Sequence, residues 1–272
     1  MNLLTGKKLL ICGISNDHSM AWGIAKKAHD EGAEIAVTYG ISGTEGKVEE
    51  LAKSIGAKFL GQYDVQNDAS IDAVFAALEK DWGTLDGCLH AIANSDPNEL
   101  KGRYADTSRG NFKNTMDVSV VSFVDMAKRA AALMKNGGSI LTLTYLGGVR
   151  AIPNYNVMGV AKAALESSAR YLAADFGKSN IRVNAISAGP ILTRAASGVA
   201  GFRSMLKVNA NLTPLGRNMS MDDVAGAAAY LFSDLSSGVT GEVHYVDGGY
   251  STTGMLPNDL KDALIKCLDA VE

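Results

Sequence analysis

Tyr145, Tyr155 and Lys162 lie close together in the sequence and could carry proton chemistry. The segment that holds them, residues 141–174, reads LTLTYLGGVRAIPNYNVMGVAKAALESSARYLAA. It predicts a short apolar strand, a loop marked by glycine and proline, and a long alanine-rich helix. Tyr155 and Lys162 would be separated by almost two helical turns, about 10 Å along the axis. Because helical side chains lean toward the N-terminus, Lys162 can reach back toward the Tyr155 hydroxyl.

The Tyr/Lys spacing alone does not define a site, because the same helix contains a second pair. The sequence has nine tyrosines, so chance matches to such a short pattern are common. Tyr171 and Lys178 have the same spacing, and Lys178 stands where the helix is expected to end. A cation there can simply interact with the helix dipole. The position of each pair in the fold must decide between them.

Length and composition indicate one large α/β domain or at most two small ones. The chain has 272 residues, of which 47% are hydrophobic and 20% charged. A net charge of −3 with scattered basic residues does not indicate a basic patch that would bind nucleic acid. The first residues, MNLLTGKKLLICG, lack the apolar segment of a signal peptide, and no later run approaches a membrane span. We therefore expect a cytoplasmic protein that binds no membrane.

Neither the cysteines nor the histidines indicate a metal site. The cysteines are Cys12, Cys88 and Cys267, and the first two lie in apolar runs typical of strands. Buried free thiols are the favoured interpretation. The four histidines have no metal-ligand spacing and no cysteine pair near them. We expect no metal.

Apolar strands and helices alternate along the chain. Strands are expected at 8–12, 34–39, 58–62, 85–93, 139–144, 182–187 and 242–246, and helices at 20–28, 48–55, 70–80, 112–134, 155–174 and 222–232. Continuous apolar strands that alternate with helices indicate a parallel sheet covered on both faces. The fold class is therefore α/β, with a single doubly wound Rossmann-type domain at 1–272 and a parallel sheet of about seven strands.

The segment 188–215 breaks this alternation with Gly189-Pro190 and several small residues. A long irregular insertion in a compact domain is usually a binding loop or a lid. We expect a substrate-binding lid at about 191–215 and a C-terminal tail at about 255–272.

Ligands of such sheets bind outside the carboxyl ends of the strands. The residues that end or follow the strands are Gly13, Asp64, Val65, Ile92, Ala93, Tyr145, Gly189 and Pro190. Tyr155 opens its helix near this edge, whereas Tyr171 and Lys178 would lie near the opposite one. The expected topology therefore favours Tyr155 and Lys162 as the functional pair.

The first turn, from Gly13 to Gly23, reads GISNDHSMAWG and departs from the usual G-x-G-x-x-G fingerprint. Gly13 could allow a tight turn, Ser19 could cap the helix and donate to a phosphate, and Gly23 could permit close packing. Taken alone, an ordinary capped turn is equally possible. The further strands and the Tyr/Lys pair favour a dinucleotide site.

Several motifs together resemble the bacterial NADH-dependent enoyl-[acyl-carrier-protein] reductases, a divergent branch of the short-chain dehydrogenase/reductase family. They are Tyr155-x2-Met158-x3-Lys162, Tyr145 ten residues earlier, Gly13-x5-Ser19-x3-Gly23, SAGPILTRAASG and HYVDGGY. The resemblance covers residues 7 to 250 approximately. A classical short-chain dehydrogenase would begin with T-G-x-x-x-G-x-G and usually has serine where Tyr145 stands, and neither feature is present.

The resemblance implies reduction of a trans-2-enoyl thioester in type II fatty acid synthesis. Negative charge would develop on the thioester oxygen, where a nearby donor must stabilise it. Tyr155 would take this role, and Lys162 would hold the nicotinamide ribose. Tyr145 would shape the substrate pocket or assist protonation; as a strand-end aromatic it could also simply belong to the core.

The resemblance also assigns the remaining site residues and the partners. The cofactor would be lined by Gly13, Ser19, Met20, Asp64, Val65, Ile92, Lys162, Ile191, Leu192, Thr193, Arg194 and Ala195. Ser95 would face the acyl substrate together with Tyr145 and Tyr155. NADH is favoured over NADPH, because residues 39–43 contain no arginine for a 2′-phosphate. Acyl-carrier protein is the expected partner, and a homotetramer is the expected assembly.

Two alternatives remain at the level of sequence. Another short-chain reductase could act on a ketone or a sugar alcohol, although Tyr145 in place of serine argues against it. A catalytically silent dinucleotide-binding sensor or structural subunit would have little need for Tyr155 and Lys162 together.

Overall fold

One seven-stranded parallel sheet organises the part of the chain that the structure describes. The computed structural model describes residues 2–192 and 202–254, and the expected tail and Cys267 lie outside these ranges. The strand order is β3-β2-β1-β4-β5-β6-β7, and every neighbouring pair is parallel. The strands are β1 Lys8–Ile14, β2 Glu34–Tyr39, β3 Lys58–Gln62, β4 Gly87–His90, β5 Gly138–Thr144, β6 Ile181–Ala188 and β7 Val243–Val246. The predicted Rossmann-type sheet is confirmed.

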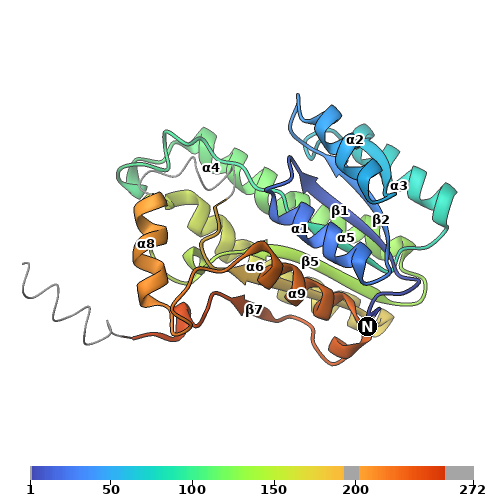
Figure 1. The fold of residues 1–272 in the computed structure, drawn as a ribbon. Coiled ribbons are helices and arrows are strands. Elements are labelled where there is room, and N and C mark those ends of the chain that lie inside the picture. Colours follow the sequence, from blue (N-terminus) through green and yellow to red (C-terminus); the bar gives the residue numbers. More distant parts are fainter. Residues whose placement is uncertain (1, 193–201, 255–272) are drawn as a thin grey trace, which may run out of the picture.

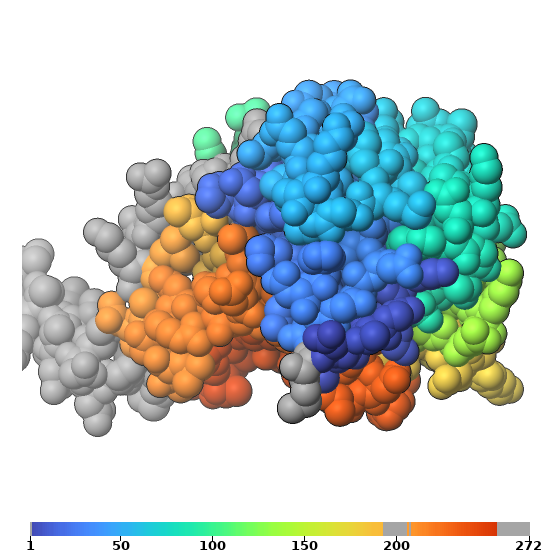
Figure 2. All heavy atoms as spheres, turned by 45° about the vertical axis from the view of Figure 1, so that its right-hand side comes forward, coloured from blue at the N-terminus to red at the C-terminus, as the bar shows by residue number. Residues whose placement is uncertain are grey.

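Helices cover both faces of the sheet. They are α1 Met20–Asp30, α2 Glu45–Ser54, α3 Asp68–Trp82, α4 Arg109–Met116, α5 Ser122–Leu133, α6 Asn156–Phe176, α8 Phe202–Leu212 and α9 Met221–Phe232. One core cluster joins the sheet to α3, α5 and α6, and a second joins it to α1, α2 and α9. Figure 1 shows α1 and α9 side by side on one face, and α8 with α4 at the end of the molecule away from the N-terminus. Figure 2 shows the N-terminal part of the chain (blue) at the front, with orange atoms of the later part of the described chain beside it.

Local signals explain where several helices begin and end. The Ser19 side chain accepts from Trp22 N at the start of α1, as expected for a cap. Asn67 caps α3 in the same way, and Gly83 ends that helix in the left-handed conformation with φ 65°. Ser220 and Asp223 form a reciprocal capping box at the start of α9. These contacts satisfy backbone groups that helix ends leave without intrahelical partners.

The helix expected at 112–134 is not one α-helix. The chain forms α4, then a π-helical turn at Asp117–Val121, then α5. β-branched residues crowd this turn, and they lose side-chain freedom in a regular helix. The widened turn also lets the Ser119 hydroxyl accept from Asn94 N at 3.2 Å, which joins it to the chain after β4. π-turns of this kind are frequent at functional sites.

The strand expected at 85–93 is shorter in the structure, where β4 covers Gly87–His90. Ala91 N still donates to Cys12 O at 3.1 Å, but the chain then leaves the sheet. The prediction of buried free thiols is confirmed for Cys12 and Cys88. No helix in the described ranges is long and apolar enough to cross a membrane. Within those same ranges, no three His, Cys, Asp or Glu residues gather as a metal site would require.

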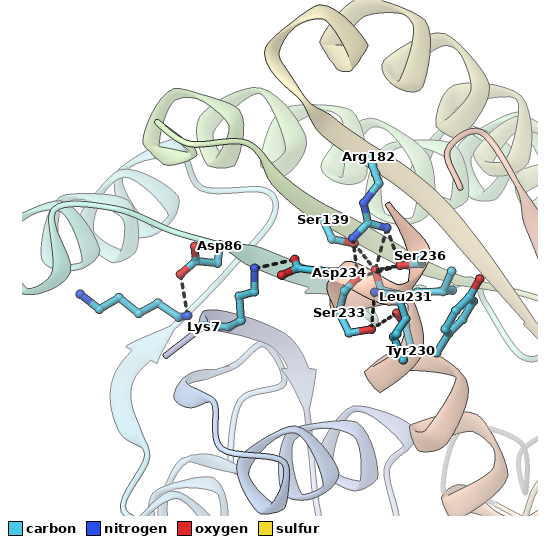
Figure 3. A network of polar contacts seen from close by, with 11 residues as sticks. Lys7, Asp86, Ser139, Arg182, Tyr230, Leu231, Ser233, Asp234 and Ser236 are labelled. Atoms are coloured by element: carbon cyan, nitrogen blue, oxygen red, sulfur yellow. Dashed lines mark hydrogen bonds and ion pairs between the residues drawn. The ribbon is translucent and has the colours of Figure 1, made fainter. Parts of the chain in front are cut away.

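A polar network fastens the amino ends of the strands to the end of α9 (Figure 3). Arg182 of β6 donates to Leu231 O at 2.9 Å, to Ser236 Oγ at 2.8 Å and to Ser233 O at 3.2 Å. The Ser139 hydroxyl of β5 also donates to Leu231 O, at 2.8 Å. These bonds satisfy carbonyl groups at the C-terminus of α9. They hold the sheet at the edge opposite the Tyr145 end of β5.

Candidate active site

The carboxyl edge of the sheet gathers most of the described residues that the sequence predicted for a site. Asp64 and Val65 follow β3, Ile92 follows β4, and Tyr145 follows β5 directly. Ile191 and Leu192 come shortly after β6. The predicted cofactor-binding residues Thr193, Arg194 and Ala195 lie outside the described residues.

Gly13 lies at the carboxyl end of β1, inside the strand. The strand runs two residues beyond its expected end at Cys12, so the turn that Gly13 could allow begins later. The φ of Gly13 is +98°, and a Cβ atom there would stand 2.2 Å from Ala91 O. Glycine is required because the chain leaving β4 crosses immediately above β1. The consequence is a close approach of backbone at the point where the sheet meets α1.

Gly23 and Ser19 shape the start of α1. A Cβ atom at Gly23 would stand 3.3 Å from Met221 Cβ, so the predicted close packing of this glycine is present, against α9. The Ser19 hydroxyl donates to Asn16 O at 2.7 Å while it caps the helix. Met20 begins α1, whose N-terminal backbone N–H groups and dipole suit an anionic group.

Tyr145 and Tyr155 lie against each other across the turn η3, Leu146–Gly148. Their ring centroids are 5.0 Å apart with an interplanar angle of 72°, an edge-to-face contact. Burial, followed by the nearby Tyr250, raises the pKa of Tyr145. Burial and then Tyr145 raise the pKa of Tyr155 above its ordinary value. Both phenols therefore remain protonated at neutral pH and can donate hydrogen bonds.

Lys162 is a buried cation on α6, seven residues after Tyr155. Lys162 is 7% exposed, and its Nζ atom donates a hydrogen bond to Leu143 O at 2.8 Å. The reach toward Tyr155 that the spacing suggested is replaced by this bond, because the end of β5 presents a carbonyl directly to the helix. Burial lowers the pKa of the ammonium to about 8, and the Glu166 carboxylate opposes that effect. The site thus holds a buried cation bonded to the end of β5, two residues before Tyr145.

Gly147 and Gly159, two glycines outside the predicted site, allow the turn after β5 to approach Tyr155 and α6 closely. A Cβ atom at Gly147 would stand 2.5 Å from the Tyr155 ring, and one at Gly159 would stand 2.8 Å from Gly147 O. The turn after β5 therefore lies directly on α6. The Gly147-Gly148 pair between a strand and a helix was the signal in the sequence that could have identified this close contact.

The remaining predicted residues make their contacts away from Tyr145, Tyr155 and Lys162. Ser95 is buried and donates to Asn111 Oδ1 at 3.3 Å, while the Thr115 hydroxyl donates to Ser95 at 2.9 Å. Asp64 Oδ1 accepts from Gln66 N at 3.0 Å and so shapes the turn after β3. Val65 and Ile92 pack against the core of α3, α5 and α6. The second Tyr/Lys pair is separated from the site, because Tyr171 is 74% exposed and Lys178 lies beyond the end of α6.

The fold and the carboxyl-edge Tyr/Lys arrangement define the class of dinucleotide-dependent reductases. Comparison with known proteins narrows this class. Residues 13–251 match the family described as Enoyl-(Acyl carrier protein) reductase. The chain belongs to this enoyl-[acyl-carrier-protein] reductase family, within the short-chain dehydrogenases/reductases. The family predicted from the motifs is confirmed.

Individual relatives match nearly the whole chain. Enoyl-[acyl-carrier-protein] reductase [NADH] 1 of Rhizobium meliloti (strain 1021) is 57% identical over 260 residues, 96% of this chain and 96% of the relative. The corresponding NADH enzyme of Escherichia coli (strain K12) is 48% identical over 262 residues, 96% of this chain and 100% of the relative. The crystal structure of the Anaplasma phagocytophilum enoyl reductase in complex with NAD has a TM-score of 0.90 and 52% identity, with 94% of this chain and 97% of that chain covered.

Proposed function

We infer that this chain is an NADH-dependent oxidoreductase that reduces trans-2-enoyl thioesters carried on acyl-carrier protein, in type II fatty acid synthesis. The observation that carries the proposal is the Tyr145–Tyr155 ring contact, together with the buried Lys162 ammonium bonded to Leu143 O at the same end of β5. The relatives named as NADH-dependent enoyl reductases support the same reaction.

The donor set fits a nicotinamide dinucleotide. Lys162 supplies a cation at the carboxyl edge, which suits the hydroxyls of a ribose. The start of α1 supplies backbone N–H groups for a pyrophosphate. We propose that Gly13, Ser19, Met20, Asp64, Val65, Ile92, Ile191 and Leu192 line the rest of this cofactor. Residues 39–43 carry no arginine, which supports NADH over NADPH.

The chain's own residues then perform three tasks, with bound NADH supplying the hydride. Tyr155 donates its hydroxyl proton in a hydrogen bond to the thioester oxygen and stabilises the negative charge that develops there. Its raised pKa keeps that proton on the oxygen at neutral pH. Lys162 holds the ribose and adds positive charge. Tyr145 shapes the pocket wall against Tyr155, and Ser95 faces the acyl group.

The lid and the assembly are part of the same proposal. We place the substrate lid at 191–215 within one domain of 1–272, with α8 as its described helix. Exposed apolar side chains on the π-turn and on α5 and α6 support a homotetramer; they are Val121, Val124 and Val160. A hollow of about 370 Å³ at the start of α6 is lined by Gly147, Tyr155 and Val160 among others, so it shares Val160 with this surface. Light scattering on the purified chain tests the assembly.

One spectrophotometric experiment tests the reaction. The purified chain is mixed with a short trans-2-enoyl thioester and either NADH or NADPH, and loss of the nicotinamide absorbance is followed. We expect turnover with NADH that exceeds turnover with NADPH. A β-ketoacyl thioester serves as the control substrate. The proposal is overturned if neither nicotinamide is consumed with the enoyl substrate, or if the ketone is the better substrate.

A further inference from the structure

Glu166 is a buried acid that the proposed reaction does not use. It lies on α6, four residues after Lys162, and the residue is 4% exposed. Its Oε1 atom accepts a hydrogen bond from Thr144 Oγ1 at 2.7 Å. A buried carboxylate is costly unless it is paired and hydrogen-bonded, so its presence in an otherwise alanine-rich helix requires an explanation.

The end of β5 is held twice by α6, through consecutive residues. Lys162 Nζ donates to Leu143 O at 2.8 Å, and the next residue, Thr144, donates to Glu166 at 2.7 Å. Side chains four positions apart lie on the same face of a helix. Tyr145 follows these two bonds directly, so its position depends on both of them.

The turn after Tyr145 encloses the carboxyl group. A Cβ atom at Gly148 would stand 2.8 Å from Glu166 Oε1 and 3.1 Å from Ala163 N. Backbone therefore lies on one side of the carboxyl group and the Thr144 hydroxyl on another. The group has a fixed place between the end of β5 and α6.

Glu166 is also the acid that acts on the Lys162 charge. Burial lowers the pKa of Lys162 to about 8, and the Glu166 carboxylate acts in the opposite direction. Other titratable groups lie around the pair. His90 of β4, Arg170 of α6 itself and Tyr245 of β7 interact with it electrostatically, and Tyr145 and Tyr155 stand at the adjoining ends of β5 and α6. His90 has a pKa of about 3, and burial raises the pKa of all three tyrosines.

We propose that Glu166 is a positioning residue for the reaction: through its bond to Thr144 it fixes the end of β5 from which Tyr145 projects, and it places a negative charge on the face of α6 that carries Lys162. This rests on the proposed function, because it takes Lys162 as the group that holds the cofactor ribose. The acid acts through Lys162 and Thr144 and does not touch the reacting atoms.

The test is the pH dependence of NADH binding to the Glu166→Gln variant. Glutamine keeps the size of the side chain and an oxygen for Thr144, but it removes the negative charge. Without that charge Lys162 loses its proton at lower pH, so the alkaline loss of NADH affinity moves down by about one pH unit. Titration of NADH fluorescence from pH 6.5 to 9.5 measures this shift. A role limited to packing would leave the pH of half-loss unchanged.

Matched variants complete the experiment. Asp175→Asn removes a negative charge from an exposed position on the same helix, and its binding profile should match that of the unaltered chain. Glu166→Asp keeps the charge but shortens the side chain, and Thr144→Val removes the bonded hydroxyl. Both variants should lower kcat with the enoyl thioester several-fold. In both, the alkaline pH at which half of the NADH affinity is lost should stay the same.

Each outcome decides the proposal. The proposal is overturned if Glu166→Gln loses half of its NADH affinity at the same alkaline pH as the unaltered chain. If Glu166→Gln does not fold, unchanged kcat in both Glu166→Asp and Thr144→Val overturns it instead. Failure of the proposed function is seen separately, as absence of enoyl turnover by the unaltered chain, while the NADH titration still judges the role of Glu166.

Discussion

The Tyr145 ring meets the Tyr155 ring edge to face, with the centroids 5.0 Å apart. Tyr145 is the first residue after β5, and Tyr155 is the residue that precedes α6. The contact therefore couples the end of a central strand to the start of the helix that carries Lys162. Gly147 allows it, because any Cβ atom there would overlap the Tyr155 ring.

Tyr155→Phe tests the proposed hydrogen-bond donor. The ring contact with Tyr145 remains, but the hydroxyl is lost, and loss of one such donor lowers kcat by roughly 10²- to 10³-fold. NADH affinity should stay within about twofold, since Lys162 is untouched. Steady-state kinetics and an NADH titration measure both quantities. Tyr171→Phe, on the exposed side of the same helix, is the control, and unchanged turnover in Tyr155→Phe would remove this residue from its role.

Substitutions of Tyr145 separate pocket shape from proton donation. Tyr145→Phe keeps the ring against Tyr155, so kcat should fall by less than about tenfold, below the loss expected for a principal donor. Tyr145→Ala removes the ring pair, which contributes about 0.5–1.5 kcal/mol beyond the area it buries, and it should raise KM as well. Kinetics of the two variants decide the role. A loss in Tyr145→Phe as large as that in Tyr155→Phe would contradict a shaping role.

The sheet and the choice of Tyr/Lys pair could be predicted because both depend on local patterns. Apolar runs gave the strands, and parallel topology brings their carboxyl ends to one edge. Glu166 was missed because a glutamate on a helix normally faces solvent, and only the packing of β5 and the turn η3 on α6 buries it. Gly13 was misplaced for a similar reason. The need for glycine comes from Ala91, which is distant in sequence and adjacent in space.

Arg182→Met tests the network at the opposite edge (Figure 3). The guanidinium is partly buried and bonds Leu231 O, Ser233 O and Ser236 Oγ. Its removal leaves carbonyl groups with fewer partners, so the free energy of unfolding should fall by about 1–3 kcal/mol. The KM for NADH should not change, because the network lies away from the carboxyl edge. Urea unfolding and steady-state kinetics measure the two effects.

Lys7→Met is the matched control for that network. Lys7 pairs with Asp234 at 2.8 Å, but the Asp234 side chain is 88% exposed. Exposed ion pairs contribute about 0–1 kcal/mol, so the free energy of unfolding should change less than in Arg182→Met. If the free energy of unfolding falls equally in the two variants, the carbonyl contacts of Arg182 stabilise the fold no more than an exposed ion pair does.

His90 should make the fold sensitive to mild acid. The ring is buried, its Nε2 atom lies 2.8 Å from Ser122 Oγ, and that hydroxyl donates to Val118 O. The serine oxygen therefore accepts from Nε2 in a neutral ring. Nδ1 lies 3.3 Å from Thr142 Oγ1, and the Thr142 hydroxyl donates to His90 O at 3.2 Å.

Burial lowers the pKa of His90 to about 3, whereas an unfolded chain binds the same proton near pH 6.5. Between these two values the unfolded state binds more protons, so its free energy falls relative to the folded state as pH decreases. The stability that the neutral ring allows is complete above pH 6.5 and is lost toward pH 3, by about 2 kcal/mol at pH 5. Urea unfolding of the unaltered chain and of His90→Gln at pH 7.5 and pH 5 measures this loss. Glutamine keeps polar contacts to Ser122 and Thr142 but does not titrate, so its stability should decrease by less over the same interval. If both proteins lose the same free energy between the two pH values, the acid sensitivity comes from other groups.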